Sequence, residues 1–153
     1  MYPRRMRIAM GSDHAGFELK EAVKGHLLSE GHDVQDVGTD SLESTDYPPY
    51  AAEAAHLVAD GKADRGVIVC GSGNGVAIVA NKVDGIRAVN AHDVAEAEMA
   101  RRHNNINVLT LSGQRLSPEA AAPIVEEFLS EEFEGGRHER RVNEIGDVER
   151  AAG

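Results

Sequence analysis

A single cysteine opens a glycine-rich segment, and its position favours acid–base chemistry beside a bound anion. Cys70 ends the apolar run Val67–Val69. It is followed by alternating small residues, Gly71, Ser72, Gly73, Asn74 and Gly75. Glycines let backbone N–H groups converge on an anion, and a thiol facing a helix N-terminus is favoured as a thiolate base. The alternative is that Cys70 is a buried small hydrophobe and the glycines only form a tight turn.

The spacing of these glycines disfavours two common phosphate loops. A dinucleotide fingerprint needs Gly-x-Gly-x-x-Gly, and Val76 occupies the sixth position here. A P-loop needs Gly-Lys-Ser/Thr, which does not occur in this segment. The segment therefore predicts an anion cradle of another kind, with Gly71, Gly73 and Gly75 as its backbone donors.

Three other segments carry groups suited to a phosphorylated sugar. Asp13 can bind hydroxyls and His14 an anion, or Asp13 simply caps the helix that follows. His103 can exchange protons with a sugar ring oxygen, or it only complements a helix dipole. Arg137 and Arg141 are four residues apart, hence on one helix face, and can grip one phosphate or form a solvated charged face.

Composition narrows the possible partners and surroundings. The chain has 153 residues and a formal net charge of −10, which disfavours binding to nucleic acid or to an anionic membrane. One cysteine cannot form an internal disulfide, and no apolar run has the length of a signal or membrane segment, so a reducing cytoplasm is expected. His14, Cys70 and His103 lack metal-ligand spacing, so we expect a site without metal.

Short apolar runs alternate with helical patterns along the whole chain. The predicted strands are 7–10, 32–37, 67–69, 87–89 and 108–111, and the predicted helices are 17–29, 48–60, 75–81, 93–102, 118–130 and 136–147. This alternation predicts an α/β fold in three α/β/α layers, a doubly wound, Rossmann-like, five-stranded parallel sheet with a C-terminal helix. We expect one domain over residues 1–153, with its site in the loops after the strands.

Seven segments in order resemble the ribose-5-phosphate isomerase type B family, which includes the galactose-6-phosphate isomerase subunits. The matching segments are 11–17, 46–48, 70–75, 80–82, 85–88, 103–105 and 135–141. The resemblance covers nearly the whole chain. It implies reversible aldose–ketose isomerisation, typically of ribose 5-phosphate and ribulose 5-phosphate, without cofactor or metal, by a homodimer or a tetramer whose sites lie between two subunits.

The resemblance also implies roles for individual residues. Cys70 would move the proton between C1 and C2, while Ser72 and the amides of residues 71–75 stabilise the enediolate. His103 would open the furanose ring with help from Asp13. The remaining substrate-binding residues would be Tyr47 and Asn104 at the sugar, with His14, Arg137 and Arg141 at the phosphate. Asn74 belongs to the same loop and is assigned to the substrate with it.

Two departures from the family pattern leave alternatives open. One branch carries Glu after the glycine loop, where this chain has Val76, so Cys70 is the base expected here. The segment from His103 to Arg115 is one residue longer than in relatives whose arginine near this place reaches the phosphate, and Arg115 is assigned to that role by position. An isomerase of a tetrose or hexose phosphate, or a non-catalytic module that binds phosphometabolites, are the alternatives.

Overall fold

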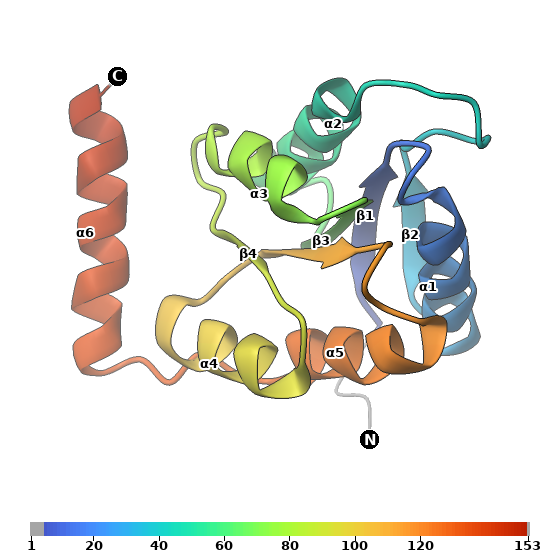
Figure 1. Ribbon diagram of the computed structural model, residues 1–153. Helices are drawn as coiled ribbons and strands as arrows, with labels where there is room; N and C mark the ends of the chain where they lie inside the picture. The colour runs from blue at the N-terminus through green and yellow to red at the C-terminus, as the bar shows by residue number, and fades with distance from the viewer. Residues whose placement is uncertain (1–4, 153) are drawn as a thin grey trace.

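A parallel sheet of five strands organises residues 5–152, the part of the chain that the computed structural model describes (Figure 1). The strands are β1 (Arg7–Ser12), β2 (Asp33–Asp36), β3 (Arg65–Cys70), β4 (Ala88–Asn90) and β5 (Val108–Ser112). Their order is β2-β1-β3-β5-β4, and every neighbouring pair is parallel. The predicted doubly wound α/β sheet is confirmed.

Right-handed crossovers decide which face each helix covers. The helices are α1 (Phe17–Ser29), α2 (Tyr47–Ala59), α3 (Asn74–Asn81), α4 (Val94–Asn104), α5 (Pro118–Ser130) and α6 (Arg137–Ala152). The connections β2 to β3 and β3 to β4 run one way across the sheet, and β1 to β2 and β4 to β5 run the other way. Helices α2 and α3 therefore cover one face, and α1, α4 and α5 cover the opposite face (Figure 1).

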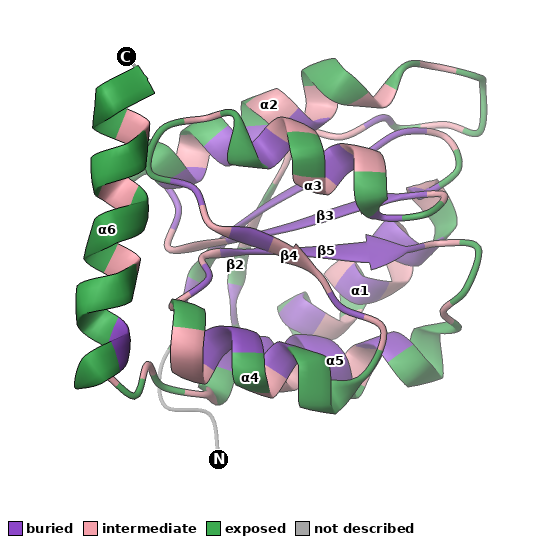
Figure 2. Cartoon of the chain, turned by 60° about the vertical axis from the view of Figure 1, so that its left-hand side comes forward, coloured by how far each residue is buried: buried purple, intermediate pink, exposed green. Residues whose placement is uncertain are grey.

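The strand β3 lies at the centre of the sheet, and its residues after Arg65 are buried on both faces (Figure 2). Val67 and Val69 belong to the core beneath α1, α4 and α5, while Ile68 and Cys70 belong to the core beneath α2 and α3. A strand covered on both faces needs apolar side chains at successive positions rather than at alternate ones. This requirement explains why the run before Cys70 is continuously apolar.

The last helix, α6, lies at the amino ends of the strands and is separate from the three layers. In Figure 2 the arrowhead of β5 points away from it, and most of its surface is exposed. The helix continues to Ala152, beyond the predicted end near Asp147. The Glu149 carboxylate accepts a hydrogen bond of 3.0 Å from the Gly85 amide, which holds the last turns against the loop before β4. No helix within the described range is both long and apolar enough to traverse a bilayer.

The seam between α4 and α5 concentrates negative charge. Carboxylate oxygens of Glu98, Glu127 and Glu131 lie within 4.8 Å of one another. A hydrogen bond with Glu131, partial burial and repulsion by the neighbouring carboxylates raise the pKa of Glu127 to about 7. The folded protein therefore holds a proton near neutral pH that the unfolded chain releases at lower pH.

Replacing Glu127 with Gln should stabilise the protein only where Glu127 is ionised. Because the folded-state pKa is about 7 against an ordinary 4.5, stability falls as pH rises through this window. We expect Glu127→Gln to raise Tm by about 1–3 °C at pH 8 and to have no such effect at pH 5, as measured by thermal unfolding. Glu132→Gln, on the turn after α5, is the control and should act equally at both pH values. Equal shifts for Glu127→Gln would contradict the assignment.

Candidate active site

Cys70 lies at the carboxyl end of the central strand, where the glycine loop begins. Its side chain is buried, and the residue is 4% exposed. The Gly73 N–H donates a hydrogen bond of 3.2 Å to Cys70 Sγ. This donor points at the atom that gains negative charge when the thiol gives up its proton. The arrangement suits proton transfer at a bound substrate, as the sequence predicts.

The glycine loop is shaped by close contacts that a side chain would obstruct. A Cβ at Gly75 would lie 2.5 Å from Tyr47 Cζ, so the tyrosine ring sits directly over the start of α3. Gly73 has a φ of +81°, in the left-handed region that favours glycine. The first turn of α3 follows at once and leaves amide groups without intrahelical acceptors. The structure thus brings Tyr47, Ser72, Asn74 and the three predicted glycines to one place.

The loop after β1 meets this segment from the other side. A Cβ at Gly16 would lie 2.4 Å from the Val69 oxygen, so the two backbones touch. Asp13 is 6% exposed, and its Oδ1 accepts a hydrogen bond of 3.0 Å from the Gly16 N–H at the start of α1. Asp13 therefore holds the turn into the helix, and it does so beside the end of β3. The N-cap of α1 is Gly16 and has no side-chain cap, so Asp13 stabilises the turn before the helix and does not cap the helix itself.

His14 presents one nitrogen to the backbone and leaves the other for a ligand. Its Nδ1 lies 3.1 Å from the Thr45 nitrogen and 3.2 Å from the Thr45 oxygen. When Nδ1 accepts the Thr45 N–H, the ring hydrogen lies on Nε2. Nε2 is then the nitrogen that is suited to contact an anion.

The turn after β5 adds a residue that the sequence reasoning missed. The Gln114 amide group lies over Gly71, where its Nε2 would be 3.1 Å from an added Cβ. Arg115 belongs to the same turn, and its backbone N–H donates to Ser112 Oγ at 3.2 Å. Both residues follow a parallel strand at the carboxyl edge, a signal that would have identified Gln114. The structure therefore places the Arg115 backbone at the same edge as Cys70.

The remaining predicted residues lie at the opposite edge of the sheet. Helix α4 begins after β4 at the carboxyl edge and runs back, so His103 is about 14 Å along its axis from the first turn. Asn104 follows it, and α6 begins nearby with Arg137 and Arg141, because the Glu134 N–H bonds the Arg102 carbonyl at 3.0 Å. Within one chain, then, His103 and the arginine pair form one group, and Cys70 belongs to another.

A pair of stacked histidines joins α4 to α6. The rings of His103 and His138 lie 4.2 Å apart at an interplanar angle of 10°. His138 Nε2 lies 3.3 Å from Glu134 Oε1, and Arg102 holds that carboxylate at 2.9 Å. Burial of the ring lowers the pKa of His138, and the positive charges of His103, Arg137 and Arg141 lower it further against the opposing effect of Glu134.

These side chains are not arranged as a typical metal site. His103, Glu134 and His138 have potential ligand atoms within 4.8 Å of one another. A tetrahedral ion needs lone pairs that converge on it, and those of an imidazole lie in the ring plane. Two nearly parallel rings do not point at one ion. The geometry fits a stacked pair that fixes the orientation of His103.

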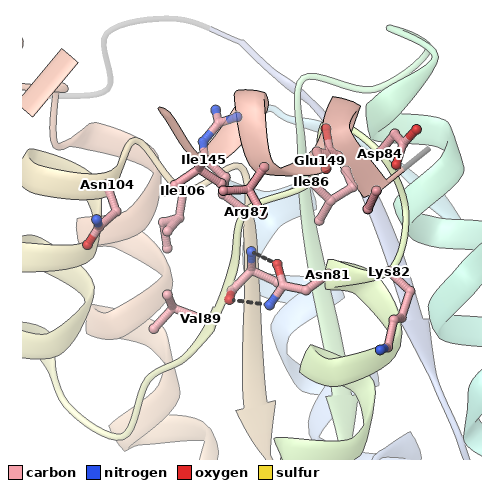
Figure 3. Close-up of a pocket in the computed structure, with 13 residues that line it drawn as sticks. Asn81, Lys82, Asp84, Ile86, Arg87, Val89, Asn104, Ile106, Ile145 and Glu149 are labelled. Carbon is pink, nitrogen blue, oxygen red and sulfur yellow. Dashed lines mark hydrogen bonds between the residues drawn. The ribbon is translucent and has the colours of Figure 1, made fainter. Parts of the chain in front are cut away.

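A cavity of about 730 Å³ opens between α6 and the amino edge of the sheet (Figure 3). Apolar side chains line much of it: Ile86, Val89, Ile106, Ile145 and Val148. Asn104 also lines it, whereas Cys70 does not. Val148 is 71% exposed and Ile145 45% exposed, so this helix presents apolar groups that the rest of the described chain leaves uncovered.

Comparison with known proteins gives consistent matches. The chain matches the family model for ribose/galactose isomerases over residues 8–145. It is 45% identical to ribose-5-phosphate isomerase B of Escherichia coli, with 94% of this chain and 96% of the relative covered. It is 41% identical to D-erythrulose-4-phosphate isomerase of Pectobacterium atrosepticum, with 94% and 95% covered.

Solved structures agree with these matches in fold as well as in sequence. Ribose-5-phosphate isomerase B of Clostridium thermocellum superposes with a TM-score of 0.95 at 42% identity, covering 97% of this chain and 100% of that one. The Mycoplasma genitalium enzyme with bound ribulose 5-phosphate gives 0.90 at 38% identity, covering 94% and 96%. The family model, the sequence identities and the fold thus agree, and the chain belongs to the ribose/galactose isomerase family.

Proposed function

We propose that this protein interconverts ribose 5-phosphate and ribulose 5-phosphate through an enediolate, with Cys70 as the base that moves a proton between C1 and C2. The observation that carries the proposal is the Cys70 thiol, which is buried at the end of β3 and whose Sγ accepts the Gly73 N–H at 3.2 Å. The names of the E. coli relative and of the ligand-bound Mycoplasma structure support the substrate.

The glycine loop would stabilise the charge that develops during this step. Removing a proton next to a carbonyl creates an oxyanion, and preorganised N–H donors stabilise it without reorganising. The backbone of residues 71–75 and the Ser72 hydroxyl would supply these donors, with Asn74 and Tyr47 at the sugar. The Cys70 thiolate would take the proton from one carbon and return it to the next, so that the thiolate is restored after each turnover.

The second group of residues would open the furanose and hold the phosphate. His103 would exchange a proton with the ring oxygen, assisted by Asp13, while Asn104 binds a hydroxyl. Arg137 and Arg141, both exposed on the first turns of α6, would bind the phosphate together with His14, and Arg115 would contribute from the β5 turn. His14 and Arg115 lie at the Cys70 edge, so the phosphate site would draw on both groups.

Because these groups lie at opposite edges of one chain, we propose a homodimer in which each site takes one group from each subunit. A two-fold axis would bring the His103 edge of one chain to the Cys70 edge of its partner, and the exchange is reciprocal. The cavity beneath α6 and the exposed Ile145 and Val148 would receive the second copy. Covering these side chains explains why α6 stands away from its own sheet.

Replacement of Cys70 by Ala should remove the proton transfer. Loss of a general base typically costs about 10² to 10⁴ in rate, and we expect a fall of that order in kcat for ribose 5-phosphate. In D2O the wild-type protein should incorporate deuterium at C2 of ribose 5-phosphate, as followed by NMR, and Cys70→Ala should not. Exchange at the wild-type rate in Cys70→Ala would contradict the assigned base. Absence of exchange in the wild-type protein would contradict the isomerase and favour the alternative of a non-catalytic module that binds phosphometabolites.

A mixed dimer should distinguish a shared site from a site within one chain. Cys70→Ala and His103→Ala chains with different tags are coexpressed, and the heterodimer is isolated by both tags. It should regain about half of the wild-type activity, because one of its two sites contains both intact residues. The control pairs Cys70→Ala with Asp13→Ala, which belong to the same edge and leave both sites defective. Equal inactivity of both heterodimers would contradict the shared site.

An isomerase of tetrose phosphates is the second candidate, favoured by the similarity to the Pectobacterium enzyme. Erythrose 4-phosphate cannot close a furanose because its O4 is phosphorylated, so it needs no ring opening. We expect wild-type kcat/KM to be higher for ribose 5-phosphate, and His103→Ala to lower it by about 10² or more for that substrate while affecting erythrose 4-phosphate much less. Higher wild-type kcat/KM for the tetrose would replace the pentose assignment, and equal losses would remove His103 from ring opening.

A further inference from the structure

The backbone carbonyls of the glycine loop are held by three polar side chains from β4 and β5. Ser112 Oγ donates to the Gly71 carbonyl at 2.6 Å, and Thr110 Oγ1 donates to the Gly73 carbonyl at 2.8 Å. Between them, Asn90 Nδ2 donates to the Ser72 carbonyl at 3.1 Å. Three successive peptide groups are therefore fixed from the same side of the loop.

From this geometry we propose that Asn90, Thr110 and Ser112 are positioning residues, which aim the loop N–H groups at Cys70 and at the developing oxyanion. The inference rests on the proposed function and extends it to three residues that bond the loop carbonyls from β4 and β5. The side chains at the ends of β4 and β5 would orient the loop, because its glycines leave the backbone flexible.

Because the peptide bond is planar, the direction of each held carbonyl also sets the direction of the N–H in the same peptide group. In a trans peptide the C=O and the N–H point in opposite directions, so a carbonyl held toward β4 and β5 sends its N–H the other way. The peptide between Ser72 and Gly73 shows the result, since Asn90 holds its oxygen and its N–H meets Cys70 Sγ at 3.2 Å. The next N–H, that of Asn74, donates to Ser72 Oγ at 3.1 Å. A hydrogen bond at the oxygen also polarises the peptide and strengthens its N–H as a donor.

Burial and close contact make this orientation strict. Thr110 and Ser112 are fully buried, so water cannot replace the hydroxyl that each one supplies. Asn90 uses its amide hydrogens on the Ser72 carbonyl and on Asn74 Oδ1, the latter at 2.7 Å. Its oxygen would lie 2.3 Å from a Cβ at Gly73. The amide therefore fits closely against a glycine, and each restricts the conformation of the other.

Thr110 offers the cleanest substitution because valine has nearly the same shape and lacks the hydroxyl. Thr110→Val should lower kcat for ribose 5-phosphate on the order of tenfold to a hundredfold, because the N–H donors of the loop are then less well oriented. KM should change less than about threefold, because the loop still binds the substrate. Thr110→Ser restores the donor and should recover most of kcat. Equal kcat in Thr110→Val and wild type, or no recovery in Thr110→Ser, would overturn the role of Thr110.

The role of Asn90 can be tested by measuring the reactivity of the Cys70 thiol. Because Cys70 is the only cysteine of the chain, alkylation by iodoacetamide reports on this one sulfur. In Asn90→Ala the pH profile of alkylation should move to higher pH, since the N–H that faces the sulfur loses its fixed direction. An unchanged profile would overturn the proposal for Asn90. This readout needs no substrate, so it separates failure of the inference from failure of the proposed isomerase activity.

The variant Val108→Ala is the control that distinguishes an effect on stability from an effect on the orientation of the loop. Val108 is fully buried on the same strand as Thr110, at its amino end and away from the loop. This control should lower Tm through the cavity that it creates, while kcat and the alkylation profile stay at wild-type values. If Val108→Ala reduced kcat as much as Thr110→Val at a comparable Tm, the effect of Thr110 would be structural and the proposal would be wrong.

Discussion

The site depends on the close approach of backbones at the carboxyl end of β3. A Cβ at Gly16 would lie 2.4 Å from the Val69 oxygen, and one at Gly113 would lie 2.7 Å from the Ala15 oxygen. These glycines let the loops after β1 and β5 close on the segment that carries Cys70. Any side chain at either position would separate the loops and with them Asp13, the thiol and the β5 turn. The buried central strand fixes where this meeting occurs, and the glycines make it possible.

The sheet and its helices could be predicted because the signals are local and repeated. Apolar runs followed by glycine or aspartate mark the strands, and the predicted bounds of α1 and α5 are those of the structure. The rule that parallel sheets bind ligands beyond their carboxyl ends then placed Cys70, Asp13 and the glycines together. The end of α6 was predicted too early because its last turns are held by a distant contact, from Glu149 to the loop at Gly85.

The separation of the candidate residues into two groups at opposite edges of the sheet could not be obtained from residue types alone. His103 follows the fourth strand in sequence, yet it lies in the last turn of α4, which runs back to the amino edge of the sheet. The stacking of His138 on His103 joins residues 35 positions apart on different helices. Asn90, Thr110 and Ser112 are ordinary polar residues in sequence, and their importance appears only when three carbonyls are seen to face them.

The stacked histidines link the orientation of His103 to the docking of α6. The ring that faces His103 belongs to the first turn of α6, so the orientation of His103 is completed only when that helix has docked. A chain with a well-formed sheet and an undocked α6 would keep Cys70 in place but would leave His103 unsupported. The contact that joins α6 to α4 is therefore also the contact that holds the His103 ring in its orientation.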